Sequence, residues 1–182
     1  MKFYLTVFFI ILSCGWASSQ ELALTTNFVD YANMGTLNIE ASYGVSKNWS
    51  LNAGAKYNPF SYRRNGDEVR SRQRTVSAGV RYWPWHIFSG WWLSGSMKYQ
   101  EYNHGGFSSQ RTTEGDRFGL GIGAGYTYML APSLNLEFGV AFWTGYDVYT
   151  SYACPTCGKK LEDGNRFFFF PSDLLLGLSY IF

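Results

Sequence analysis

Hydrophobic and polar residues alternate along most of this chain. In residues 36–45, apolar side chains occupy the odd positions from Leu37 to Val45, and polar or small side chains lie between them. Successive side chains of a strand point to opposite faces of its sheet, so this period of two predicts strands that each have one apolar face. Eight strands are predicted in this way, at residues 21–29, 36–45, 49–60, 73–83, 90–102, 116–130, 134–143 and 174–182.

The connections between these segments alternate in length. Long polar connections are expected at residues 30–35, 61–72, 103–114 and 150–166, and short turns at 46–48, 84–89 and 131–133. Bacterial outer-membrane barrels have short periplasmic turns and longer extracellular loops. The order of the segments therefore favours an all-β fold, an eight-stranded antiparallel up-and-down transmembrane β-barrel with both termini in the periplasm.

The two faces of the predicted strands have opposite character. One face is apolar almost throughout, and the other carries the charged residues Glu40, Lys56, Arg81, Lys98, Glu137 and Asp173. A water-soluble barrel would place its apolar face inside, so the pattern indicates an apolar face toward lipid and a charged lumen. Because side chains can fill an eight-stranded barrel, we expect a network of ion pairs there. A narrow channel for ions or protons is the alternative.

Aromatic and glycine residues support the same fold. Aromatic residues form 20% of the chain, and rings gather at both boundaries of a membrane. Two girdles are predicted, one of Trp49, Trp83, Trp85, Trp91, Tyr128 and Tyr180 and the other of Tyr57, Phe60, Tyr99, Tyr102 and Tyr146. The glycines at 119, 121, 123 and 125 share one strand face, where they would leave room for large inward side chains.

The first residues read as a targeting segment. Lys2 precedes an apolar run at residues 3–12 and small residues at 13–19, a pattern typical of a secretory signal peptide. We expect a signal peptide at 1–19 and a barrel domain at 20–182, in the outer membrane of a Gram-negative bacterium. A lipoprotein signal with Cys14 as the lipidated residue is the alternative.

Charge and the scarcity of histidine argue against two classes of function. The net charge of +2 is small, and no basic helix is predicted that could follow a nucleic acid backbone. The two histidines, His86 and His104, have no serine or aspartate at a catalytic spacing. We therefore expect neither an enzyme nor a cofactor, with a barrel enzyme acting on outer-membrane lipid or protein as the alternative.

Three local features are candidate sites. Cys154 and Cys157 predict a disulfide in the last loop, with half of a zinc site joined by His104, or free thiols, as alternatives. Four arginines, Arg63, Arg64, Arg70 and Arg72, against Asp67 and Glu68 give a loop of local charge about +2. This loop could contact lipopolysaccharide phosphates, with an ordinary solvated loop as the alternative. Tyr180 and the terminal Phe182 resemble the mark by which outer-membrane barrels are recognised by the barrel assembly machinery.

Several short motifs, in their order along the chain, resemble a known family. They are Thr25-Thr26-Asn27, Asn38-Ile39-Glu40, Lys47-Asn48-Trp49-Ser50-Leu51, Tyr57-Asn58-Pro59-Phe60, Arg81-Tyr82-Trp83, Cys154-x-x-Cys157-Gly158 and the final Leu-Ser-Tyr-Ile-Phe. The family is one of Bacteroides-type outer-membrane proteins that carry a domain of unknown function and are often encoded near fimbria-like adhesins. Its usual Gly-Pro-Thr-Lys-like segment is replaced here by Phe170-Pro171-Ser172-Asp173.

The resemblance implies the barrel and its location, and it transfers no activity. We therefore expect a non-enzymatic barrel with a filled lumen and a structural or surface-interaction role through four extracellular loops. The expected partners are outer-membrane lipid, lipopolysaccharide, the barrel assembly machinery and a surface protein, with a link to fimbria-like assemblies implied by the resemblance alone.

Overall fold

The computed structural model describes residues 22–64, 67–106, 111–154 and 158–182, and it is almost entirely β-structure. Within these ranges, nine strands and one short helix follow one another. Their bounds are β1 (Leu22–Asn27), α2 (Phe28–Ala32), β2 (Leu37–Ser46), β3 (Trp49–Asn58), β4 (Ser61–Arg64), β5 (Asp67–Tyr82), β6 (Gly90–Gly105), β7 (Thr112–Ala131), β8 (Leu134–Tyr152) and β9 (Lys160–Ile181).

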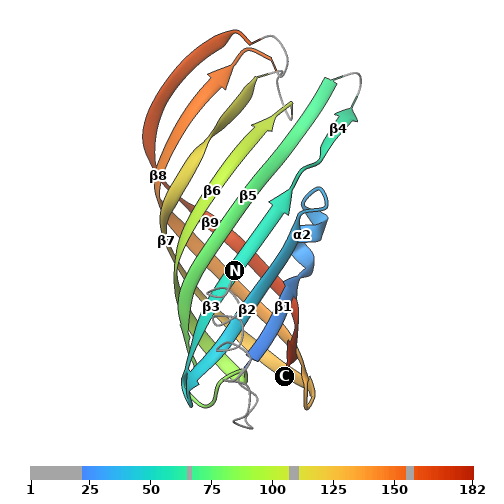
Figure 1. The fold of residues 1–182 in the computed structure, drawn as a ribbon, viewed down its shortest axis with the longest axis vertical. Coiled ribbons are helices and arrows are strands. Elements are labelled where there is room, and N and C mark those ends of the chain that lie inside the picture. The colour runs from blue at the N-terminus through green and yellow to red at the C-terminus, as the bar shows by residue number, and fades with distance from the viewer. Residues whose placement is uncertain (1–21, 65–66, 107–110, 155–157) are drawn as a thin grey trace, which may run out of the picture.

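The sheet closes on itself. Neighbouring strands pair in the order β3-β2-β1-β9-β8-β7-β6-β5-β4, and β3 also pairs with β5. Every pairing is antiparallel. All strands except β4 therefore form a ring, which Figure 1 shows from the side with α2 over the upper ends of β1 and β2. The ring closes where Ala23–Asn27 of β1 pair with Gly177–Ile181 of β9. Above this level, β9 pairs with β8.

The antiparallel all-β fold is confirmed, but the strands reach further than the alternation predicts. Most of the expected loops at 61–72, 103–114 and 150–166 belong to strands, and the strand count is nine because β4 forms a hairpin with β5. In these upper parts, polar side chains occupy both faces, so the sequence has no period of two to detect. Pairing with the neighbouring strand supplies the backbone hydrogen bonds instead. None of the helices among the described residues is long and apolar enough to cross a membrane.

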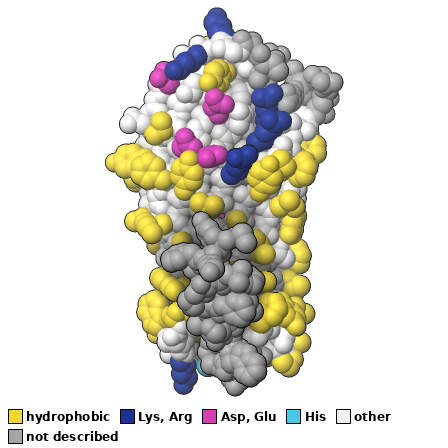
Figure 2. Space-filling model, in the orientation of Figure 1, with side chains coloured by type: hydrophobic (Ala, Val, Ile, Leu, Met, Phe, Trp, Pro, Cys, Tyr) yellow, Lys and Arg dark blue, Asp and Glu magenta, His cyan; other side chains and the backbone are white. Residues whose placement is uncertain are grey.

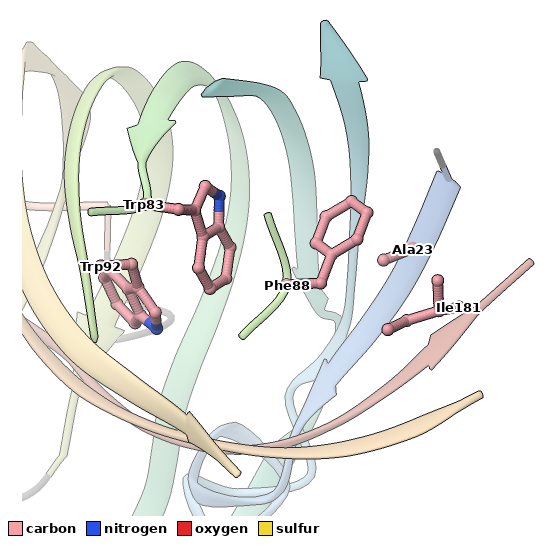
Figure 3. Packing of buried hydrophobic residues seen from close by; sticks show 5 residues of the cluster. All are labelled: Ala23, Trp83, Phe88, Trp92 and Ile181. Atoms are coloured by element: carbon pink, nitrogen blue, oxygen red, sulfur yellow. The ribbon is translucent and has the colours of Figure 1, made fainter. Parts of the chain in front are cut away.

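A small apolar cluster closes one end of the ring. Ala23 of β1, Trp92 of β6 and Ile181 of β9 pack there with Trp83 and Phe88, which belong to the connection between β5 and β6. Figure 3 shows these five side chains converging from separate elements. The connection is tied across this end, since Asn135 donates to the Phe88 carbonyl at 2.7 Å and Asn48 donates to the Trp83 carbonyl at 2.6 Å. We call this cluster the plug and the opposite end of the ring the mouth.

Glycines make room for one tryptophan of the plug. Gly125 and Gly139 are direct partners across β7 and β8. A Cβ atom at either position would lie within 2.3 Å or 2.7 Å of the Trp92 ring, respectively. The prediction that the glycine column leaves space for a large inward side chain is therefore confirmed.

The outward face of the ring is apolar and exposed. Leu37, Val76, Met97, Ile122 and Phe138 come from five different strands and are all between 43% and 68% exposed. Many of the inward positions between them are polar or small, as Ser42, Asn52 and Ser77 illustrate. The structure thus has the two faces that the alternation predicts, with the apolar face outside.

Two aromatic residues predicted for the girdles lie inside the ring. Trp83 is fully buried and donates from Nε1 to the Ser50 hydroxyl at 3.1 Å, and Tyr102 is only 5% exposed. The inward placement of both side chains follows from strand alternation, because their neighbours Tyr82 and Glu101 face outward. The other nine predicted girdle residues are exposed on the surface.

Candidate functional site

The space inside the ring holds a cavity of about 340 Å³. Inward side chains from most strands of the ring line it, and so do Asp30 and Asn33 beside the mouth. Trp92 of the plug borders it on one side and His104 near the mouth on the other. Three clusters of charged side chains lie along this axis, and they are the candidate site.

The first cluster, next to the plug, is centred on Arg81. Its Nη1 donates to Glu137 Oε2 at 3.0 Å, and its Nη2 donates to Glu40 Oε1 at 2.7 Å. The Arg81 Cζ atom lies 4.2 Å from the centroid of the Trp92 ring. Arg81 and Glu137 have side chains that are 6% and 2% exposed. Such deeply buried charges are tolerated because each has a partner of opposite sign.

The second cluster is centred on Asp173 of β9, halfway along the lumen. Lys56 of β3 and Lys98 of β6 both form ion pairs with its carboxylate. Lys56 also pairs with Asp30 of α2 at 2.8 Å. The six charged residues predicted for the lumen are therefore divided between two clusters, and Asp30 joins them although its segment was predicted to be a loop.

The third cluster lies at the mouth and was not predicted. Asp147 of β8 is fully buried. It accepts a hydrogen bond from the Tyr102 hydroxyl at 2.7 Å and from Arg166 Nε at 2.9 Å, and Arg117 Nε lies 3.4 Å from its Oδ2 atom. The Arg117 Cζ atom also lies 3.8 Å from the centroid of the Tyr102 ring.

The reason for the omission lies in the element bounds. Asp147 and Arg166 fall beyond the ends of the predicted strands, at 143 and 174. Arg117, in contrast, stands within a predicted strand on its glycine face, and that position already indicated an inward side chain.

His104 stands beside this cluster. Its ring stacks on Tyr102 with a centroid distance of 5.2 Å. Burial first, and then the positive charge of Arg117, lower the pKa of His104 to about 4. The imidazole is therefore neutral at physiological pH and contributes packing and hydrogen-bonding capacity at the mouth, but no charge.

The sequence as a whole matches the family described as "Protein of unknown function (DUF3575)" over residues 5–182. The chain belongs to the DUF3575 family. This confirms the resemblance to a family defined by a domain of unknown function, while the Bacteroides-type origin and the link to fimbria-like adhesins stay predictions. No curated protein matches the chain.

The remaining predicted sites of this DUF3575 chain lie outside the lumen. Cys154 is disulfide-bonded, whereas Cys157, its predicted partner, lies outside the described residues. Tyr180 and Phe182 are both exposed, and their ring centroids are 4.9 Å apart. Among the described residues, no three His, Cys, Asp or Glu side chains are grouped as metal ligands.

The four arginines proposed as a lipopolysaccharide contact belong to one hairpin. Arg63 and Arg64 lie in β4, and Arg70 and Arg72 lie in β5, which pairs with it. Arg72 is exposed and donates from Nε to the Ser61 hydroxyl at 3.0 Å. The hairpin stands at the mouth end of the ring (Figure 1).

Proposed function

We propose that this chain is a non-enzymatic outer-membrane β-barrel that carries a wall of extended strands at the cell surface and does not conduct. The observation that carries the proposal is the combination of an exposed apolar outer face with a charged, ion-paired interior. In Figure 2, hydrophobic side chains lie along both sides of the middle and lower part of the visible face, and most of the visible acidic and basic side chains gather above them.

The exposed apolar face would be unfavourable in water and suits lipid. A closed ring is also one of the two backbone arrangements that satisfy every polar group within a bilayer. Exposed rings border the apolar face at both ends, with Trp49 and Trp91 toward the plug and Tyr57, Tyr99 and Tyr146 toward the mouth. Such rings anchor a membrane protein at the two interfaces.

Above the membrane, the wall of extended strands offers a polar surface for contacts with other molecules. Arg74 of β5, Glu101 of β6 and Asp116 of β7 are exposed side chains on one row across three strands, as their pairing register gives. A surface row with charges of both signs suits recognition of a polar partner. We propose that this wall performs the surface-interaction role.

The side chains that fill the lumen favour a closed barrel rather than a channel. The plug fills one end with two tryptophans and a phenylalanine, and the Arg81 and Asp173 clusters cross the middle. An ion passing through would have to separate buried ion pairs, which is costly in a medium of low dielectric constant.

Membrane fractionation tests the proposal. The protein, expressed with its leader, should appear in the outer membrane, resist a sodium carbonate wash, and migrate differently on a denaturing gel before and after boiling, because a folded barrel resists detergent. The chain released by carbonate, or one with identical migration in both samples, would contradict the proposal.

A contact of the β4–β5 hairpin with lipopolysaccharide phosphates is a second part of this proposal. Guanidinium groups bind phosphate in a bidentate manner. Replacing Arg63, Arg64, Arg70 and Arg72 by glutamine should reduce the lipopolysaccharide that co-purifies. Lys159 and Lys160 lie outside this hairpin, at the start of β9, and replacing them by glutamine is the control. Equal amounts in all three preparations would refute the contact.

A further inference from the structure

The upper part of β9 has a neighbouring strand on one side only. Near its lower end, Gly177–Ile181 pair with β1. The Asn27 side chain then donates to the Leu174 carbonyl and accepts from the Leu176 N–H, at 3.1 Å each, and α2, which follows Asn27, is also in contact with β9. Above this level, residues 160–173 pair with β8, and no other strand of the described chain pairs with them. The side of β9 away from β8 is therefore a sheet edge at the mouth.

The backbone groups of Phe167 and Phe169 face this edge. The Phe168 carbonyl accepts a hydrogen bond from the Thr144 hydroxyl of β8 at 3.0 Å, so this carbonyl points toward β8. In an antiparallel strand, the N–H and C=O groups of successive residues point to opposite sides. Those of Phe167 and Phe169 therefore point away from β8, where no strand among the described residues meets them.

The stretch at residues 164–170 lacks the features that usually protect an edge. Charged side chains, proline and bulges commonly prevent an edge strand from pairing with another chain. In β9, Pro171 and the bulge beside it follow this stretch, and the acidic residues 162–163 precede it. The one charged residue within it, Arg166, turns inward to the buried Asp147 at 2.8 Å. The edge is therefore open to a further strand at these residues.

This edge reaches the proposed boundary of the membrane. Phe167 is the direct partner of Tyr146, one of the rings that border the apolar face toward the mouth. The side chains of Phe167 and Phe169 are 65% and 67% exposed. An open sheet edge that faces lipid is unfavourable, because no water is present to satisfy its backbone groups. An extended strand supplies the matching row of backbone donors and acceptors.

A second copy of the chain is a poor source of this strand. Two β9 edges can continue one sheet only antiparallel, about a two-fold axis perpendicular to the sheet. That axis would turn one of the two rings upside down in the membrane. The other end of the sheet, β4, has only four residues, and it is shorter than the open stretch.

From these observations, we infer that residues 164–170 of β9 bind an extended segment of a partner protein as an additional antiparallel strand. Main-chain hydrogen bonds hold the segment, as in other cases of strand addition to a sheet edge. Its side chains opposite residues 167–170 are apolar, because cross-strand neighbours pack on one another, and the side chain opposite Arg166 is acidic. The inference deepens the proposed surface-interaction role, and it rests on the proposed function for the position of the membrane boundary.

Fluorescence anisotropy of a labelled peptide, added to the protein refolded in detergent, tests the inference. The probe is Lys-Val-Ile-Val-Ile-Glu-Thr-Thr-Lys, which in antiparallel register places its two isoleucines opposite Phe169 and Phe167 and its glutamate opposite Arg166. It should bind saturably, with a Kd below about 100 μM. N-methylation of both isoleucines, whose N–H groups face β9, should lower the affinity at least about tenfold. N-methylation of both valines is the matched control and should leave the affinity unchanged, because their N–H groups face away.

Two substitutions in the protein separate the backbone from the ring. Phe169→Ala and Phe169→Pro both remove the ring, and only proline also removes the N–H donor. Because this N–H points away from β8, proline leaves the ladder with β8 in place. Phe169→Pro should bind the peptide about three- to tenfold more weakly than Phe169→Ala, the loss expected for one hydrogen bond. A heat-shifted gel band establishes that each variant is folded.

Several outcomes would overturn the inference. They are the absence of saturable peptide binding up to roughly 1 mM, equal affinities for the two methylated peptides, and equal affinities of the two variants. A concentration-dependent dimer that Phe169→Pro abolishes would also overturn it, because the edge would then belong to a second copy. The outer-membrane proposal is tested separately by fractionation, since peptide binding is measured in detergent.

Discussion

At the scale of single residues, Arg81 shows how burial and charge act together in the lumen. Its guanidinium lies between two carboxylates from different strands, Glu40 of β2 and Glu137 of β8. Removing it would leave Glu137 charged, buried and without its counterion. Breaking such a pair costs far more than its net contribution to stability, because the remaining charge stays desolvated.

We predict that Arg81→Gln lowers the free energy of unfolding by about 3–5 kcal/mol. Lys160→Gln is the control, because Lys160 pairs with Asp163 at 3.2 Å on the surface, where both side chains are more than half exposed, and exposed pairs contribute about 0–1 kcal/mol. Urea unfolding of the refolded proteins measures both. Equal midpoints for the two variants would show that the buried pair has no special role.

A pH effect is expected from His104. Its pKa is about 4 in the folded chain against an ordinary value near 6.5, so between these values the unfolded chain binds a proton that the folded chain does not. Stability should therefore fall as the pH drops from 6.5 toward 4, by roughly 1–2 kcal/mol at pH 5.

His104→Gln should remove this part of the pH dependence while leaving the contribution of the neighbouring acids. The measurement is the difference in urea midpoint between pH 7 and pH 5 for both chains. A variant that loses as much stability as the parent between these values would exclude His104 as the cause.

At the scale of elements, β9 shows how one irregularity sets which side chains face the lumen. Asp173 is the partner of Ala141, and Pro171 is the partner of Phe142, so Ser172 is an extra residue in the ladder. Such a bulge reverses the alternation on its two sides. Phe168 is consequently buried above it and Ile181 below it, and Asp173 lies between the two lysines.

The end of β9 gives a prediction for assembly. Phe182 donates its backbone N–H to the Leu22 carbonyl at 2.8 Å, and its exposed ring packs on Tyr180 at 4.9 Å. Phe182→Asp should reduce the amount of heat-modifiable protein in the outer membrane severalfold, since it places a charge in the apolar girdle. Phe182→Tyr is the control and should assemble normally. Wild-type amounts of folded Phe182→Asp would disprove the prediction.

The disulfide of Cys154 gives a second prediction for an element. The bond lies between β8 and β9, where the Ala153 N–H donates to the Lys159 carbonyl at 2.9 Å. If Cys157 is the partner, so short a closed loop removes little entropy from the unfolded chain, and its effect is local. Intact cells treated with a membrane-impermeant reductant should then gain thiol label at both positions.

Labelling at these cysteines before reduction would mean that the thiols are free. In that case, protection by zinc would test the alternative of a metal site. A Cys154→Ser and Cys157→Ser chain serves as the control for labelling elsewhere, and its free energy of unfolding in urea should differ from that of the parent by less than about 1 kcal/mol.

At the scale of the whole molecule, the ring encloses a cavity that the plug closes at one end and that is open at the mouth. We predict that the purified protein does not conduct ions in a planar bilayer, because the plug and two clusters of ion pairs obstruct the lumen. The double variant Trp83→Ala and Trp92→Ala removes the two largest side chains of the plug and leaves both clusters of ion pairs, so it should not conduct either. Steady single-channel currents from the parent chain would contradict the closed barrel.

The sequence by itself determined the all-β class, the apolar and polar faces, and the inward placement of Glu40, Lys56, Arg81, Lys98, Glu137 and Asp173. A period of two is a local property, and each side chain reports its face through its immediate neighbours. The same reasoning fails where both faces are polar. For that reason most of the upper parts of β5 to β9 were predicted as loops, and Arg166 was missed. Asp147 lies between the exposed side chains of Tyr146 and Val148, so there the alternation continues beyond residue 143, where the predicted strand ends.

Only the tertiary structure decided which charges pair. Glu40, Arg81 and Glu137 come from three strands far apart in sequence, and the register of the closed ring places them in contact. The same holds for the plug, where Ala23, Trp92 and Ile181 of three strands pack with Phe88 of the connection after β5. Contacts across a ring depend on closure and register, which are non-local, so no pattern within one strand contains them.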